Sequence, residues 1–279
     1  MKKLAQRLDS ATHEALVARV RFYRDLGLTE FYRRPVDPAL AALLAAEPEP
    51  ETETLNPISQ PVKSKGEDVI PPRKLVSAPP QITAVVPAAE RASALQLIRD
   101  EIGDCTRCPL HQGRNKIVFG DGDPAARLMF VGEGPGADED AQGIPFVGKA
   151  GQLLNNMIAA MGLRRDQVYI ANVVKCRPPG NRVPEQEEGA TCTPFLLRQI
   201  DVIRPQVLVA LGATAATWLL GSRQPLAGLR GRVHAVRGAQ LIVTYHPAYL
   251  LRDPRQKKEA WADLQIAMRE LGLKSPEKS

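Results

Sequence analysis

Short apolar runs alternate with longer segments of helical periodicity from residue 91 onward, and this alternation constrains the fold more than any other feature of the sequence. The apolar runs cover residues 128–131, 168–174, 207–211 and 241–244. Helices are expected at 92–104, 149–161, 184–203, 213–220 and 256–271. Buried strands that alternate with helices predict a parallel sheet covered on both faces, so the expected fold class is α/β.

Two further regions precede this domain, which we expect to span residues 91–275. Residues 1–46 have apolar side chains at near-helical spacing and predict a helical N-terminal extension. Residues 47–90 are rich in proline among Glu, Ser, Thr and Lys, a composition that favours a flexible linker. We expect any protein partner to bind the extension and the protein to be monomeric.

The balance of charge points to a polyanionic partner. The formal net charge is +6, which suits nucleic acid, although many ordinary proteins are also mildly basic. After Met1-Lys2-Lys3, polar residues interrupt any signal-like apolar segment, and no stretch approaches the roughly 20 apolar residues that span a bilayer. We therefore expect a cytoplasmic protein, in which thiols stay reduced.

The four cysteines predict a metal centre. Cys105 and Cys108 form a Cys-x-x-Cys pair, whereas Cys176 and Cys192 are 16 positions apart. In a reducing compartment such cysteines are more often metal ligands than disulfides. Structural zinc sites usually have two tight pairs, and four thiolates also hold a 4Fe–4S cluster. The spacing alone leaves zinc and iron–sulfur open.

Unusual residues follow the carboxyl ends of the predicted strands, where open parallel sheets bind ligands. The first strand runs into Gly132-Glu133-Gly134-Pro135-Gly136, the second contains Asn172, and the fourth is followed by His246. The glycine-rich loop alone is typical of a tight strand-to-helix turn, and it lacks the Gly-Lys-Ser/Thr of a phosphate-binding loop. A lone histidine is more often structural. The convergence of several strand ends nevertheless predicts an active site.

Five colinear segments resemble the family 4 (type 4) uracil-DNA glycosylases, the iron–sulfur branch of that superfamily. They are Cys105–Cys108, Gly132–Gly136, Pro145–Gln152, Asn172–Pro179 and His246–Arg252. The resemblance covers about residues 91–272 and implies a three-layer fold with a central four-stranded parallel sheet. It also implies a base-excision-repair hydrolase that cleaves the N-glycosidic bond of deoxyuridine in single- or double-stranded DNA, leaving an abasic site. Cys105, Cys108, Cys176 and Cys192 would hold a 4Fe–4S cluster.

The resemblance also implies roles in a uracil pocket. Phe146 would stack on a uracil flipped out of the DNA, and Asn172 would pair with its edge. The backbone of Glu133, Gly134 and Pro135 would bind uracil O2. His246 would donate a hydrogen bond to the departing base.

The catalytic carboxylate and the DNA contacts are further expectations. Many relatives have Asp one position after Glu133, where this chain has Gly134. Glu133 is therefore the first choice to orient water or stabilise the cationic sugar, and Glu139 is the second. The expected DNA contacts are Lys149, Lys175, Arg177, Arg182, Tyr249, Leu250 and Arg252.

Two alternatives lack turnover. One is a uracil-DNA-binding relative that traps the base covalently and carries a histidine between its two later cysteines. This chain has no histidine between Cys176 and Cys192, which argues against it. The other is a non-catalytic iron–sulfur DNA-binding module, and the presence of Phe146, Asn172 and His246 argues against that.

Overall fold

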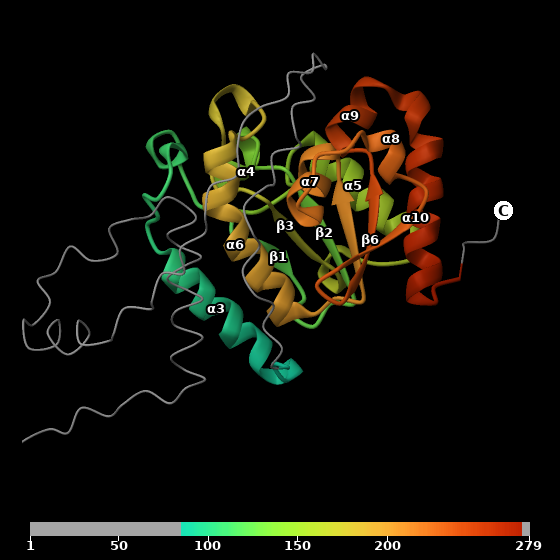
Figure 1. Cartoon of the computed structure of the whole chain (residues 1–279), viewed down its shortest axis with the longest axis horizontal. Coiled ribbons are helices and arrows are strands. Elements are labelled where there is room, and N and C mark those ends of the chain that lie inside the picture. Colours follow the sequence, from blue (N-terminus) through green and yellow to red (C-terminus); the bar gives the residue numbers. More distant parts are fainter. Residues whose placement is uncertain (1–84, 275–279) are drawn as a thin grey trace, which may run out of the picture. The chain divides into compact units, whose positions relative to one another are not determined.

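The computed structural model describes residues 85–274 (Figure 1). The predictions of a helical extension at 1–46 and of a linker over 47–84 lie outside these residues. Residues 85–90, also expected in the linker, are ordered: Ala88–Glu90 forms the 3₁₀ helix η1, and Val86 packs against the core. The described structure therefore includes a few residues before the predicted start of the domain.

A six-stranded sheet forms the centre of the domain, in the order β1-β3-β2-β4-β6-β5. The strands are β1 (Asp121–Gly122), β2 (Leu128–Gly132), β3 (Tyr169–Asn172), β4 (Val207–Leu211), β5 (Val233–Val236) and β6 (Ala239–Thr244). The four central strands pair in parallel, which confirms the predicted four-stranded parallel sheet. The edge strands β1 and β5 are antiparallel to their neighbours, so the complete sheet is mixed.

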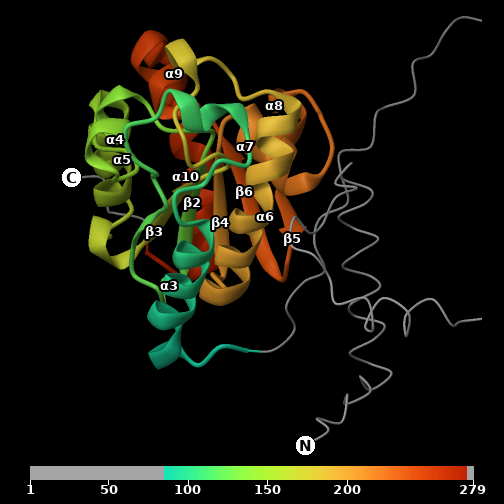
Figure 2. The same ribbon diagram turned by 90° about the vertical axis from the view of Figure 1, so that its left-hand side faces the viewer.

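Helices cover both faces of the sheet. They are α3 (Arg91–Ile102), α4 (Ala137–Gln142), α5 (Lys149–Ala160), α6 (Gln186–Ile203), α7 (Ala213–Leu220), α8 (Leu226–Leu229), α9 (Pro247–Arg252) and α10 (Lys257–Leu271). Short 3₁₀ helices η2 (Pro109–Gln112), η3 (Arg165–Gln167), η4 (Pro179–Asn181) and η5 (Pro254–Gln256) connect them. Figures 1 and 2 show α6 and α10 on opposite sides of the strands.

Alternation along each strand explains the three layers. In β2, Met129 and Val131 pack in one core with α3, α6 and α7, whereas Leu128 and Phe130 pack in the other with α5 and α10. Successive strand residues point to opposite faces, so a strand covered on both sides must be apolar throughout. All five residues of β2 are buried, as are all five of β4.

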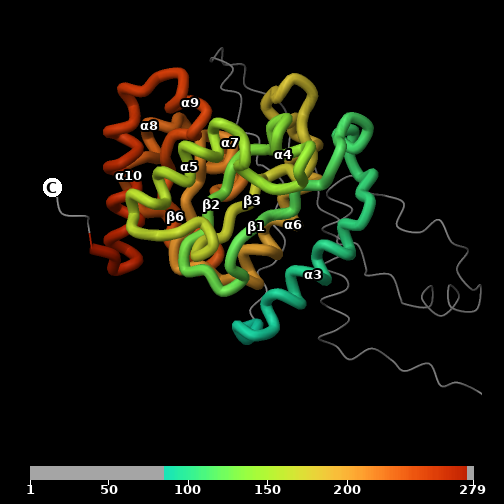
Figure 3. Tube along the Cα trace, turned by 180° about the vertical axis from the view of Figure 1, so that it is seen from behind, coloured from blue at the N-terminus to red at the C-terminus, as the bar shows by residue number. Residues whose placement is uncertain are grey.

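The carboxyl ends of the parallel strands share one end of the sheet. In Figure 3, α4, the start of α5 and α9 gather at that end. These elements directly follow β2, the Pro145–Gly148 loop and β6 along the chain. Among residues 85–274, no helix is both long enough and apolar enough to cross a membrane.

Candidate active site

Three residues that are distant in sequence meet where β2 and β3 end. Gly132 and Asn172 are register partners in the parallel pair of β2 and β3. A Cβ atom on Gly132 would lie 2.4 Å from Asn172 Oδ1 and 2.6 Å from Phe146 Cζ. Only glycine permits this approach. The structure therefore brings Phe146 and Asn172 together, as the sequence predicts.

The side chain of Asn172 has an unsatisfied acceptor. Asn172 is 1% exposed, and its Oδ1 has no hydrogen-bond partner in the described part of the chain. A buried amide oxygen without a donor is costly, and most such atoms in native proteins are paired. A ligand that offers an N–H group at this position would supply the hydrogen bond that Asn172 Oδ1 lacks.

Phe146 is held in an uncommon backbone conformation. Its φ is +54°, in the left-handed region that an aromatic residue rarely adopts. Arg165 donates to the carbonyl of Phe146 at 3.1 Å and to that of Pro145 at 2.5 Å. A Cβ on Gly151 would lie 1.9 Å from the Phe146 oxygen, so the first turn of α5 also encloses this peptide. Arg165 is a positioning residue that the sequence analysis missed.

His246 completes the site as a neutral hydrogen-bond donor. Its ring centroid lies 5.6 Å from that of Phe146. The N–H of Ala248 donates to His246 Nδ1 at 3.1 Å, at the start of α9. Burial, with a smaller contribution from the charge of Arg252 and against that of Glu139, lowers the pKa of His246 from 6.5 to about 4. Because Nδ1 is an acceptor and the ring is neutral near pH 7, the remaining proton resides on Nε2.

Glu139 and Glu133 differ in what their carboxylates bind. Glu139 Oε1 accepts the N–H groups of Val147 and Gly148 at 2.9 and 3.0 Å, and Oε2 accepts that of Gly136 at 3.0 Å. Glu139 thus joins the glycine-rich loop to the loop that carries Phe146. Glu133 is partly exposed, accepts a hydrogen bond from Thr214, and has a pKa raised by burial. This geometry favours Glu133 over Glu139 as the catalytic carboxylate.

Two expected DNA contacts are wrong. Lys175 is 2% exposed and its ammonium lies in the core, where it cannot reach a phosphate. Leu250 is 1% exposed because the α9 helix turns it toward the interior, whereas the neighbouring Leu251 is 44% exposed. Leu251 is therefore the apolar side chain that this helix presents to solvent.

The other expected DNA contacts are accessible and stay predictions. Lys149 and Arg252 are exposed, and Arg177 and Tyr249 are partly exposed. Arg182 forms ion pairs with Glu188 at 2.7 Å and Glu185 at 3.1 Å, so its charge is already compensated.

Packing that the sequence analysis missed holds the Tyr249 side chain in place. The Tyr249 ring lies on that of Tyr245, with centroids 5.1 Å apart. The guanidinium carbon of Arg230 is 4.0 Å from the Tyr245 centroid, within the range of a cation–π contact. Arg230 also forms an ion pair with the buried Asp263 at 2.7 Å. This stack anchors the start of α9 beside His246.

The cysteine cradle, defined as Cys105, Cys108, Cys176 and Cys192, contains four free thiols that influence one another. Burial raises the pKa of Cys176, Arg114 lowers it, and Cys108 and Cys105 raise it further. Burial, against the opposing charge and backbone N–H of Lys175 and with smaller contributions from Cys176 and Cys108, raises the pKa of Cys192 to about 12. The thiols therefore share one neighbourhood. Within residues 85–274, no group of three or more Cys, His, Asp or Glu side chains is arranged so as to hold a metal ion.

Nitrogen donors surround the cradle. Arg107 Nη1 lies 3.2 Å from Cys105 Sγ, and Arg114 Nη1 lies 3.5 Å from Cys176 Sγ. The backbone N–H of Lys175 lies 3.3 Å from Cys192 Sγ. Cationic and N–H donors stabilise thiolates, the form in which cysteine binds metal. Such donors would favour the thiolate form of these cysteines, and the basic residues beside the cysteines were the available sequence signal.

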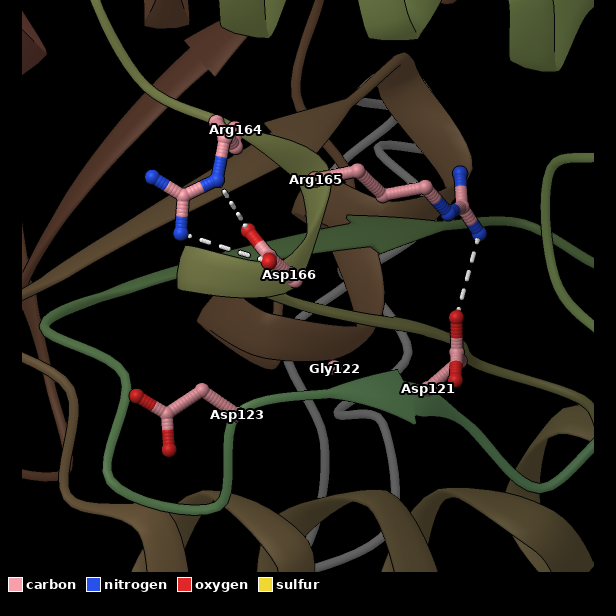
Figure 4. Close-up of a pocket in the computed structure, with 6 residues that line it drawn as sticks. All are labelled: Asp121, Gly122, Asp123, Arg164, Arg165 and Asp166. Atoms are coloured by element: carbon pink, nitrogen blue, oxygen red, sulfur yellow. Dashed lines mark hydrogen bonds and ion pairs between the residues drawn. The ribbon is translucent and has the colours of Figure 1, made fainter.

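A hollow lined by charged residues lies elsewhere on the surface. It measures about 700 Å³ and is lined by Asp121, Gly122, Asp123, Arg164, Arg165 and Asp166 (Figure 4). Arg164 pairs with Asp166 at 3.0 Å, and Arg165 pairs with Asp121 at 3.6 Å. These groups come from β1, η3 and their flanking loops, and four of them neutralise one another. We call this hollow the charged depression.

Comparisons with known proteins identify the family of the chain. Residues 119–265 match the model of the uracil DNA glycosylase superfamily. The type-4 uracil-DNA glycosylase of Thermotoga maritima is 47% identical over 165 residues, which cover 58% of this chain and 86% of that protein. The type-4 enzyme of Pyrobaculum aerophilum is 44% identical over 178 residues, covering 61% and 91%. A type-5 uracil-DNA glycosylase of the same organism is 34% identical over 146 residues, covering 46% and 64%. The chain belongs to the uracil-DNA glycosylase superfamily and, within it, to the type-4 uracil-DNA glycosylases.

Proposed function

We propose that this chain excises uracil from DNA by hydrolysing the N-glycosidic bond of deoxyuridine, in a pocket formed by Phe146, Asn172 and His246. Membership of the type-4 family supports a uracil-excising DNA repair glycosylase. The observation that carries the choice of pocket is the buried, unpaired Oδ1 of Asn172 beside the ring of Phe146.

Recognition of the base rests on Asn172. A base must leave the helical stack to be reached by an enzyme that acts on it. In the proposed pose Asn172 Oδ1 accepts from uracil N3–H, its amide nitrogen donates to O4, and Phe146 stacks on the ring. Cytosine presents the reversed pattern of donor and acceptor at these positions. It would leave buried groups unpaired, and such mismatches give strong rejection.

Cleavage rests on His246 and Glu133. The bond between uracil N1 and sugar C1′ breaks, and its electron pair leaves with uracil as an anion shared between N1 and O2. The Nε2–H of His246 donates to O2, where the negative charge develops. The carboxylate of Glu133 faces the cationic sugar and orients water. The water oxygen bonds to C1′, and its proton passes to Glu133 and then to solvent or base.

The cofactor that we propose for the cysteine cradle is a 4Fe–4S cluster held by Cys105, Cys108, Cys176 and Cys192. Four thiols from three segments and the nitrogen donors around their sulfurs support a group with net negative charge. When bound, it would tie the segment before η2 to the loop after β3 and to α6. No redox step is needed for hydrolysis.

One sample tests enzyme and cofactor together. Purified chain should release free uracil from DNA that contains deoxyuridine, but no base from matched DNA with thymine or cytosine. Its visible spectrum should show the broad absorbance of an iron–sulfur cluster. Metal analysis should find iron and no zinc. Intact absorbance without uracil release would contradict the proposed enzyme, and a stoichiometric DNA complex would then favour a binding protein.

A further inference from the structure

Lys175 is a buried cation whose described partners are neutral. It is 2% exposed, and its ammonium donates to the carbonyl of Asn172 at 2.9 Å and to Gln199 Oε1 at 2.6 Å. Both acceptors are uncharged amide oxygens. Burial of an ammonium group costs several kcal/mol unless an opposite charge compensates it. Hydrogen bonding alone therefore does not account for a lysine at this position.

The cysteine cradle lies next to Lys175 and would carry negative charge once its thiols bind a metal group as thiolates. The backbone N–H of Lys175 contacts Cys192 Sγ at 3.3 Å, and Cys176 is the next residue in the chain. Cys192 and Gln199 are both on α6, seven residues apart, which is two helical turns and hence the same face. One helix face thus contacts both ends of Lys175.

The network around the ammonium is fixed on its far side as well. Gln199 Nε2 donates to the carbonyl of Phe119 at 3.1 Å and to the hydroxyl of Tyr169 at 3.3 Å. These bonds orient the Gln199 oxygen toward Lys175. The ammonium therefore has a defined location, with Asn172 at the end of β3 on one side and α6 on the other.

We propose that Lys175 is a positioning residue that joins the cysteine cradle to the uracil pocket, because its ammonium fixes the Asn172 peptide and compensates the negative charge of the cradle's thiolates. The part of this proposal that concerns Asn172 and catalysis rests on the proposed function. Asn172 reads the base with a side chain whose direction depends on its own backbone. Without the ammonium, the buried carbonyl of Asn172 loses its donor, and the N–H of the same peptide, which Val173 donates to the Gly132 carbonyl at 2.9 Å, holds the peptide from one side alone.

The test compares holoenzyme variants. Lys175→Met keeps the length of the side chain and removes its charge and donors, whereas Lys175→Arg keeps both. Lys274→Met is the matched control, because Lys274 is exposed and follows the end of α10. Two rates are measured: loss of the visible absorbance on addition of EDTA, and single-turnover uracil release per mole of bound iron.

Lys175→Met should lose its absorbance about tenfold faster and release uracil roughly 10- to 100-fold more slowly, and the enzyme concentration that gives half of the maximal single-turnover rate should stay within about twofold of the parent. Lys175→Arg should recover most of both rates, and Lys274→Met should match the parent. A Lys175→Met protein with parental values for both rates would overturn the proposal. So would one that loses thermal stability alone, since that is what a purely structural lysine predicts.

A second variant keeps the proposal testable if Lys175→Met fails to fold. Gln199→Met removes one acceptor and leaves the bond to Asn172, so it should move both rates in the same direction by about threefold. Parental values for this variant would also overturn the proposal. If the parent protein releases no uracil, the proposed function fails by itself, and the EDTA comparison then decides the role of Lys175 at the cradle.

Discussion

The uracil pocket and the charged depression differ in whether their polar groups already have partners. The depression measures about 700 Å³, yet Arg164 pairs with Asp166 and Arg165 pairs with Asp121. The pocket around Phe146 holds a buried carboxamide oxygen without a partner and a histidine kept neutral by burial. Groups left unsatisfied by the fold are available to a ligand, whereas groups already paired are not. Unpaired buried atoms are therefore the stronger indication of a ligand site than a hollow whose charges are already paired.

Replacement of Asn172 should give the largest effect and tests the pocket side of this comparison directly. Asn172→Ala removes the only contacts that distinguish uracil in the proposed pose, so uracil release should fall by about a thousandfold. The melting temperature should stay within a few degrees, because the lost Oδ1 makes no bond in the described chain. Asp166→Asn in the depression is the control and should leave the rate unchanged. A loss below about tenfold for Asn172→Ala would remove it from recognition.

His246 allows its two nitrogens to be tested separately. His246→Asn retains an oxygen able to accept from the Ala248 N–H, since Asn is a good N-cap residue. It loses the Nε2–H donor, so single-turnover release should fall by about a hundredfold with little change in melting temperature. His246→Ala loses both groups and should fall equally in rate, with a lower melting temperature as well. If the Asn variant keeps its rate, the Nε2–H is not the catalytic donor.

Arg165 belongs to both regions, since it lines the charged depression and bonds the Phe146 carbonyl. Arg165→Met should relax the Phe146 peptide and lower uracil release by about tenfold, a moderate effect expected of a residue that only positions another. Arg164→Met is the matched control, because the Arg164 side chain is 70% exposed and pairs with Asp166. Equal effects of the two substitutions would indicate a general role of charge in DNA binding instead.

The smallest expected effect is in the pH dependence of stability. The pKa of His246 is about 4 in the folded protein and 6.5 ordinarily. Between these values the unfolded chain binds the proton and the folded chain does not, so stability falls as the pH is lowered from 6.5 to 4. The melting temperature of the parent should therefore fall more steeply over this interval than that of His246→Asn. Parallel curves for the two proteins would show that His246 is not buried in its neutral form.

The sequence predicted the sheet well where strands are buried on both faces. The central strands appear as apolar runs, and β4 and α7 have the predicted bounds. The edge strands were missed because β1 has two residues and β5 is largely exposed. The helices α4 and α9, with six residues each, are too short for helical periodicity to reveal them.

At the site, the strand ends predicted that Asn172 and His246 would be functional residues. The burial and the partners of each side chain could not be predicted from the sequence. Lys175 lies in a basic loop, and nothing local distinguishes a buried lysine from a solvated one. Leu250 and Leu251 differ only in the direction that one turn of α9 gives them. The partners of Glu139 and Arg165 depend on how separate loops fold against each other.

The carboxylate of Glu139 has a consequence for motion. It closes a ring from Gly136 to Gly148 by binding three backbone N–H groups with one side chain. Neither loop can open alone without releasing the carboxylate, so the segment should open as a single cooperative unit. In hydrogen exchange, the amides of Gly136, Val147 and Gly148 should then show a common protection factor, although they lie on two different loops. The glycine-rich loop and the loop that carries Phe146 would then move together and not independently.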